Sequence, residues 1–127
     1  MTIDASDNRG DMTWRELCDW AWSETAPVHS NRANLLLHAV AVPLFVAAHV
    51  VFVVGAFTDW HLIIAAPILM LASLMLQKKG HGLEEIQVKP FSGPYDFFRR
   101  LYVEQFWNYW RFLLTGQWFT AFSRGRR

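Results

Sequence analysis

The sequence predicts an all-α integral membrane protein with a single domain, organised around a two-helix transmembrane hairpin. Residues 35–57 hold no aspartate, glutamate, lysine or arginine, and a helix of that length can cross the hydrocarbon core of a bilayer. A second apolar run, residues 60–77, follows after only Thr58 and Asp59 and is close to the shortest length that spans. Because so short a loop makes the helices antiparallel, the start of the first and the end of the second are expected at the same membrane face.

Composition and charge support this fold class. The 127 residues are 53% apolar and only 18% charged, so the bilayer is expected to supply the core that a soluble domain would need. The net charge is +1, and the basic residues concentrate beyond residue 77, a distribution that suits anionic lipid headgroups and disfavours nucleic acid as a partner. Cys18 is the only cysteine, which excludes an intrachain disulfide and a cysteine metal cluster.

The basic residues also indicate the orientation of the hairpin. Three arginines precede it, its connecting loop has no basic residue, and nine lysines and arginines follow it. The positive-inside rule then predicts that both termini face the cytoplasm. Asp59 and His61 are expected on the far side.

The N-terminal part is predicted to hold a tail and one helix. Residues 1–12 are expected to form a mobile tail. Thr13 and Glu16 stand in the pattern of a capping box, which predicts a helix over residues 14–25. Its tryptophans favour the headgroup level, so the helix is expected to lie on the membrane surface. A helix that faces the protein core is the alternative, and the two are compatible.

A third helical pattern covers residues 95–114, with Pro94 at its first position and Gly116 just past its end. Its amphipathic character predicts an interfacial or partly inserted helix rather than a full crossing. The polar stripe of this helix consists of Arg100, Glu104, Asn108 and Arg111. We expect a solvated face here, and the alternative is that Glu104 is a metal ligand or orients a metal-bound histidine.

Polar side chains gather where the hairpin begins and ends. Asn34 and His38 are four residues apart, so they share one helix face and can form a hydrogen bond. Gln77 and His81 are also one turn apart. If the second helix continues through the glycines that flank His81, then Glu84 and Glu85 lie on the same helix face as Gln77 and His81.

Three of the five histidines are expected to converge at one membrane face. His29, His38 and His81 come from three parts of the chain that the short loop brings together. Imidazoles suit iron, zinc or copper, and the carboxylates that could complete such a site are Glu84, Glu85 and Glu104. Structural, hydrogen-bonded histidines are the alternative, and spacing alone leaves both open. His49, about 16 Å deeper, and His61, at the opposite end, are expected to be structural.

These residues together form a pattern known from one family. The pattern consists of His29, Asn34, His38, Pro43, Gln77 and Gly80-His81-Gly82, with acids soon after it. It resembles the membrane 2-hydroxy fatty acid dioxygenases, which include fungal 2-hydroxypalmitic acid dioxygenases and small bacterial members. Residues 100–106 and 111–116 resemble the C-terminal pattern of the bacterial members, and the resemblance covers most of residues 14–118.

The resemblance implies an iron(II) enzyme of a bacterial inner membrane that uses dioxygen to shorten a 2-hydroxy fatty acid by one carbon. It implies that Fe²⁺ is bound by His29, His38 and His81, and that Asn34 and Gln77 support these ligands without binding the metal. The cations that could pair with the substrate carboxylate are Arg32, Lys78 and Lys79. Two other interpretations stay open: a non-enzymatic membrane protein whose histidines and carboxylates hold a homo-oligomer together, and a haem protein whose histidines come from two protomers.

Overall fold

Helices are the only regular elements in residues 9–126, the part of the chain that the structure, a computed structural model, describes. In chain order they are the 3₁₀ turn η2 (Arg9–Asp11), α1 (Trp14–Thr25), α2 (Arg32–Thr58), α3 (Trp60–His81), α4 (Pro94–Val103), the π-helical segment η3 (Glu104–Asn108), α5 (Tyr109–Leu114) and α6 (Gln117–Arg124). The predicted all-α class is confirmed. Because α4, η3 and α5 follow one another without a break, they form one long C-terminal helix, residues 94–114.

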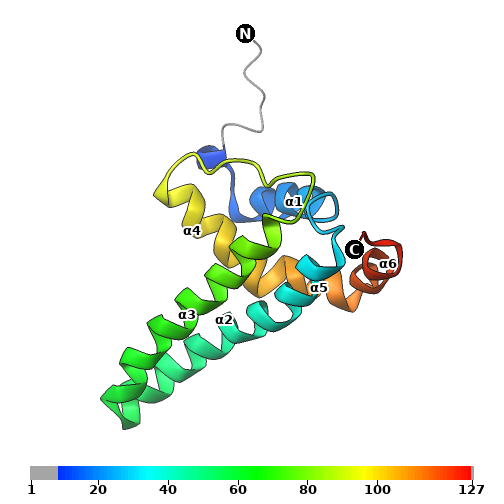
Figure 1. Ribbon diagram of the computed structural model, residues 1–127. Coiled ribbons are helices and arrows are strands. Elements are labelled where there is room, and N and C mark those ends of the chain that lie inside the picture. The colour runs from blue at the N-terminus through cyan, green and yellow to red at the C-terminus, as the bar shows by residue number, and fades with distance from the viewer. Residues whose placement is uncertain (1–8, 127) are drawn as a thin grey trace.

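Two long apolar helices, α2 and α3, lie side by side as an antiparallel pair (Figure 1). Each is long and apolar enough to cross a membrane. Both are longer than the sequence predicted, because the Asn31 side chain caps α2 so that it begins at Arg32, and α3 continues through Gly80 to His81. Helix α3 thus passes through one of the glycines that flank His81 and ends at the other, Gly82.

Small residues and one polar contact hold α2 and α3 together. Asp59 alone separates the helices, and its side chain caps α3 by accepting the His61 N–H at 3.0 Å. Close to this turn, Gly55 allows the backbones to approach, since a Cβ there would lie only 2.7 Å from the Leu62 Cβ. Farther along, the Ser73 hydroxyl donates to the Ala41 carbonyl across the pair at 2.5 Å. The contact between the helices is therefore close along their length.

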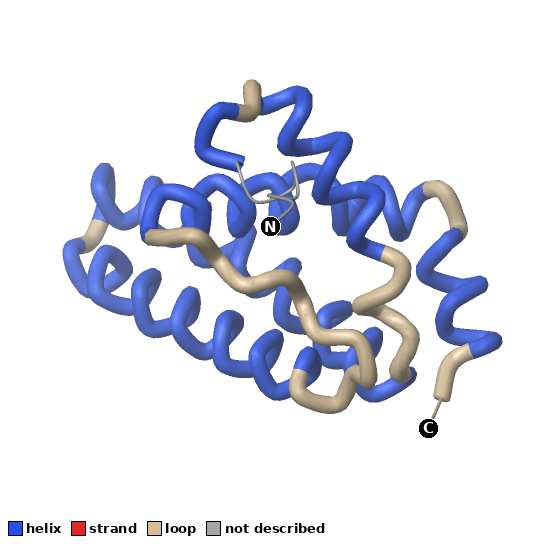
Figure 2. Tube along the Cα trace, turned by 90° about the horizontal axis from the view of Figure 1, so that it is seen from above, coloured by secondary structure: helices blue, strands red, loops and turns tan. Residues whose placement is uncertain are grey.

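Helix α1 and the long C-terminal helix lie against the end of the pair that is opposite Asp59 (Figure 1). The predicted capping box begins α1: Thr13 Oγ1 accepts the Glu16 N–H, and the Glu16 carboxylate accepts the Thr13 N–H, both at 3.2 Å. The predicted bounds of this helix are confirmed. Residues 82–93 form a loop that crosses over the same end of the molecule (Figure 2). This end therefore gathers every segment that carries a candidate ligand.

Part of the predicted mobile tail, residues 1–12, is ordered, since Arg9–Asp11 form the turn η2. Residues 1–8 lie outside the described residues, whereas Arg9 is buried and forms an ion pair with Asp96 at 3.0 Å. Arg9 also donates to the Pro90 carbonyl at 2.7 Å, and Asp96 accepts the Ser92 N–H at 3.0 Å. Asp96 thus ties the N-terminal segment and the loop before α4 to the first turn of that helix.

Helix α6 was not predicted from the sequence, and it returns the chain to the start of α2. The turn before it uses Gly116 with a φ of 81°, a conformation that favours glycine. The Arg126 N–H donates to the Ser30 carbonyl at 3.1 Å, and the Arg32 N–H donates to the Arg126 carbonyl at 2.9 Å. Arg32 also donates to the Phe122 carbonyl at 2.8 Å. These bonds hold the C-terminal segment against the loop between α1 and α2.

The Arg9–Asp96 pair predicts an acid-sensitive stability. Burial alone would raise the pKa of Asp96, but hydrogen bonds from Arg9 and Ser92 and the charges of Arg9 and Arg100 hold that pKa below its ordinary value. The stabilisation is therefore present above the unfolded pKa, about 3.9, and is lost as the pH falls through the lowered folded value. Asp96→Asn should lower the stability at neutral pH by about 3–5 kcal/mol and remove this acid-induced loss.

Thermal unfolding in detergent as a function of pH measures both effects. Asp19→Asn, at an exposed position of α1, serves as the matched control and should leave the profile unchanged. An acid-induced loss that persists in full in the Asp96 variant would show that another group causes it.

Candidate metal centre

His29 lies in the loop after α1, and its ring is oriented by that helix. Its Nδ1 atom is 2.7 Å from the carbonyl of Thr25, the last residue of α1. Because a carbonyl only accepts, Nδ1 carries the hydrogen and Nε2 keeps a lone pair. The Nε2 atom is buried and has no hydrogen-bond partner among the described residues. The ring is thus held with its lone pair directed into the protein.

His38, in the second turn of α2, is oriented in the same way. Its Nδ1–H donates to the Asn34 carbonyl at 3.0 Å, which leaves the Nε2 lone pair available. The predicted hydrogen bond between Asn34 and His38 is therefore present, but Asn34 contributes its backbone carbonyl, because its side-chain Nδ2 donates to Val28 and Glu84. Metal-binding histidines commonly donate their other ring N–H to a backbone carbonyl, and both His29 and His38 have this arrangement.

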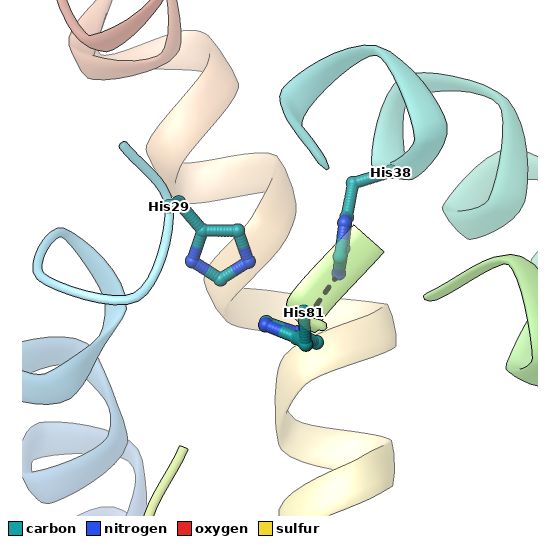
Figure 3. Close-up of side chains that lie close together, drawn as sticks. All are labelled: His29, His38 and His81. Atoms are coloured by element: carbon teal, nitrogen blue, oxygen red, sulfur yellow. Dashed lines mark hydrogen bonds between the residues drawn. The ribbon is translucent and has the colours of Figure 1, made fainter. Parts of the chain in front are cut away.

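His81, the last residue of α3, completes the predicted convergence (Figure 3). Its Nε2 atom is 3.1 Å from the Nε2 atom of His38, so His81 donates this bond, and its Nδ1 atom is buried without a partner in the described part of the chain. One ring nitrogen from each of His29, His38 and His81 lies within 4.8 Å of the other two. The convergence is confirmed. These three residues are called the histidine cluster below.

Glu84 fastens the segments that carry the histidine cluster. Its carboxylate accepts the N–H groups of Ser30 and Asn31 and the Ser30 hydroxyl, each at 2.9 Å, and the Asn34 amide at 2.7 Å. Burial alone would raise the pKa of Glu84, but these hydrogen bonds lower it below its ordinary value. Glu84 is therefore an anionic anchor whose oxygens are already engaged. Glu85, in contrast, is exposed and forms an ion pair with Arg126.

Close contact between α2 and α3 at this end depends on Gly80. A Cβ at that position would collide with the Asn34 side-chain oxygen. Gln77, one turn earlier on α3, is buried and exchanges two hydrogen bonds with Gln105, at 2.9 and 2.7 Å. This amide pair joins α3 to the long C-terminal helix just beside the histidine cluster.

Glu104 places a carboxylate close to a cluster atom that lacks a hydrogen-bond partner within residues 9–126. Its Oε1 atom lies 3.9 Å from His29 Nε2, which is too long for a hydrogen bond, and within residues 9–126 neither atom has a hydrogen-bond partner. Burial raises the pKa of Glu104 above its ordinary value, and the nearby His29 and Arg100 offset only part of that shift. The predicted solvated stripe is therefore wrong at Glu104, which is half-buried, and at Asn108, which is fully buried.

The two remaining histidines are satisfied by local partners. His49 lies between the Phe45 carbonyl, at 2.9 Å, and the Tyr102 hydroxyl, at 2.8 Å. His61 is exposed, forms a hydrogen bond with Asp59 at 2.7 Å and stacks on the Trp60 ring. Their predicted structural roles agree with these contacts.

An open groove of about 750 Å³ adjoins the histidine cluster, with His29 and His81 among its lining residues. The wall that α3 contributes consists of Leu71, Leu74, Met75, Gln77, Lys78 and His81. The facing wall comes from α1 and the long C-terminal helix and includes Arg100 and Leu101. Of the three cations predicted to meet a substrate carboxylate, Lys78 lines the groove, whereas Arg32 donates to Phe122 and Ser123 and Lys79 is not among the lining residues.

The anchor role of Glu84 predicts a large difference between two neighbouring acids. Glu84→Gln should lower the free energy of unfolding by about 1.5–3 kcal/mol, because an amide oxygen replaces an anionic acceptor of several donors. Glu85→Gln, the matched control, should change it by less than about 1 kcal/mol, since its ion pair is exposed. Chemical or thermal unfolding in detergent measures both. Equal effects would contradict the anchor role.

The donor set of this site fits a transition metal. Three imidazoles converge, two of them with the tautomer that puts the lone pair on Nε2, and a carboxylate oxygen without a hydrogen-bond partner among residues 9–126 lies beside them. Imidazole with carboxylate suits iron, zinc or copper. Comparisons of the chain with family models, with curated proteins and with solved structures find no match, so the function has to be inferred from the chain's own residues and the resemblance.

Proposed function

We propose that this protein is an iron(II)-dependent membrane dioxygenase that shortens 2-hydroxy fatty acids by one carbon. The observation that carries the proposal is the histidine cluster at the side of an open groove, next to two helices of membrane-spanning length. The resemblance of the sequence to the 2-hydroxy fatty acid dioxygenases supplies the substrate class and the choice of iron. The metal and the polar head of the substrate need the histidines, and the acyl chain needs the apolar surroundings.

His29, His38 and His81 would hold Fe²⁺, because their ring nitrogens converge and two of them donate their other N–H to backbone carbonyls. Three nitrogen ligands leave coordination positions open. When bound, Fe²⁺ would supply chelation of the hydroxy acid and redox activation of dioxygen. Overall, the bond between C1 and C2 breaks, and a 2-hydroxy acid with dioxygen gives the acid shorter by one carbon, carbon dioxide and water.

The groove would orient the substrate by separating its two ends. Leu71, Leu74 and Met75 form an apolar wall on α3. This wall begins at Leu71, roughly 15 Å from His81 at about 1.5 Å per residue, and runs along the helix toward that histidine. An acyl chain against this wall would bring its head to the histidines. Lys78, one turn before His81 on the same wall, would pair with the carboxylate.

Glu104 would accept the proton that the substrate hydroxyl loses. Its carboxyl lies beside His29, and Glu104 also lines the groove, so it is placed next to a substrate head held at the histidines. Its Oε1 atom lies on the side of the long C-terminal helix that is next to His29, and it lacks a hydrogen-bond partner within the described residues. Glu104 would therefore move a proton at Oε1 while the histidines hold the metal.

Insertion of α2 and α3 in a bilayer is part of the proposal. Large apolar side chains on both helices are exposed outside the groove, and the set includes Leu36, Val40, Val50, Phe52, Val53, Ile64 and Ile68. Lipid would cover this surface, which a soluble monomer would leave in water. Helix α1 and the long C-terminal helix would then lie at the headgroup level of the cytoplasmic face, together with the histidine cluster.

Alanine variants of the cluster test the metal site. His29→Ala, His38→Ala and His81→Ala should each lower the bound iron at least about tenfold and abolish consumption of a 2-hydroxy acid, because the ligands act as one unit. Iron content and substrate loss are measured on equal amounts of folded, detergent-purified protein.

His49→Ala and His61→Ala are the controls and should keep iron, since their partners lie outside the cluster. Normal iron and turnover in any one cluster variant would remove that residue from the site, and in two variants would end the three-histidine proposal. A wild-type protein without metal after anaerobic supplementation with iron would favour structural histidines, and a haem absorption band would favour haem.

Cysteine labelling tests the orientation. In a Cys18→Ser background, Thr58→Cys should react with a membrane-impermeant maleimide in intact cells, because Thr58 ends α2 at the turn between the two spans. Ser123→Cys should react only after permeabilisation, since the basic C-terminal region is expected in the cytoplasm. The reverse pattern would overturn the proposed orientation.

A further inference from the structure

Asn108 is a polar residue whose environment nothing in the fold explains. It ends the π-helical segment η3 and has no exposed surface. Both its Nδ2 and Oδ1 atoms are buried, and neither has a hydrogen-bond partner within residues 9–126. A buried amide that stays unpaired lowers the stability of the fold, so such a residue calls for a ligand or a function.

The residues one turn away on either side show which way Asn108 faces. Glu104, one turn earlier, has its Oε1 atom 3.9 Å from His29 Nε2. Phe112, one turn later, has its ring centre 5.9 Å from that of His29. Since side chains four residues apart share a helix face, Asn108 lies on the face that the long C-terminal helix turns toward the histidine cluster. Figure 3 shows this helix passing behind the three rings.

The π-helical segment adds a second reason to connect Asn108 with the site. A π-helix widens the turn, and such segments occur frequently at functional sites. Here the Gln105 carbonyl, inside the widened turn, accepts the Trp110 indole N–H at 2.9 Å. The segment begins at Glu104 and ends at Asn108, so the irregular turn is bounded by the two polar residues that face the cluster.

From these observations we infer that the Asn108 amide binds the polar head of the substrate at the histidine cluster and selects acids that carry a 2-hydroxyl group. This inference rests on the proposed function for the identity of the ligand. An amide offers one acceptor, Oδ1, to a hydroxyl and two donor hydrogens on Nδ2 to a carboxylate. Adjacent hydroxyl and carboxylate groups match this pair, whereas an unsubstituted fatty acid leaves the acceptor unpaired.

The energetic consequence is a preference between two acids that differ in one hydroxyl. A site whose buried polar group is paired only by the correct substrate rejects the analogue that lacks the partner. One hydrogen bond contributes up to about 1.5 kcal/mol, which is about tenfold in affinity. Asn108 is therefore expected to account for about a tenfold share of the selectivity, in addition to any share from metal chelation.

The test compares wild type with Asn108→Leu, which keeps a similar volume but has no polar group. Binding of 2-hydroxypalmitic acid and of palmitic acid is measured without oxygen on the iron-loaded protein in detergent. We expect the variant to keep its iron and to lower the affinity ratio of the two acids about tenfold. Phe112→Leu, which changes packing on the same helix face, is the control and should keep the wild-type ratio.

Stability of the metal-free protein gives an independent measurement. Because Asn108→Leu removes an unpaired buried amide, its melting temperature should equal or exceed that of wild type. A large decrease would show that the amide has a structural partner and would overturn the inference. A leucine variant that does not fold would overturn the inference in the same way, because the amide would then have a structural role.

The remaining outcomes separate this inference from the proposed function. An unchanged affinity ratio in an iron-loaded Asn108 variant overturns the role of Asn108 and leaves the proposed function intact. A wild-type protein that binds iron but shows no preference for the hydroxy acid overturns both the proposed substrate class and the selective role of Asn108.

Discussion

One carboxylate sets the relative positions of the three histidines. Glu84 lies three residues beyond His81, accepts hydrogen bonds from the two residues that follow His29, and accepts another from the Asn34 side chain, one turn before His38. A buried anion is costly unless its oxygens are paired, so this network allows little displacement of any segment without a penalty. The geometry of the cluster therefore depends on a residue that need not touch a metal.

Local sequence rules predict the elements on which this network is built. The Thr13 and Glu16 pair is enough to give the start of α1, because a capping box satisfies its first amides within four residues. The near absence of a loop around Asp59 forces α2 and α3 to return antiparallel, and this constraint alone brings His38 and His81 together. Convergence of the cluster was thus predictable, since it follows from chain connectivity rather than from side-chain detail.

The features that escaped prediction depend on what covers a residue. Glu84 takes its role as anchor from Ser30 and Asn31, more than 50 residues earlier, and no local spacing contains that information. Helix periodicity showed that Glu104 and Asn108 share a face, but it cannot show that other segments pack against that face, as His29 in the loop after α1 does beside Glu104. A polar stripe on a helix has the same pattern whether water or protein lies over it.

Unpaired polar atoms gather at the same end of the molecule, which bears on how stability and function are balanced. Within residues 9–126, six of the eight buried side-chain nitrogen and oxygen atoms without a hydrogen-bond partner belong to His29, Asn34, His81, Glu104 and Asn108. Each such atom lowers stability by about 1–3 kcal/mol, which is large beside a typical total of 5–15 kcal/mol. The other two belong to Arg99 and Trp118, whereas His49 is paired with Tyr102. A ligand that pairs these six atoms regains the lost free energy on binding. Substitutions at these residues that stabilise the ligand-free protein should therefore lower its affinity for the ligand.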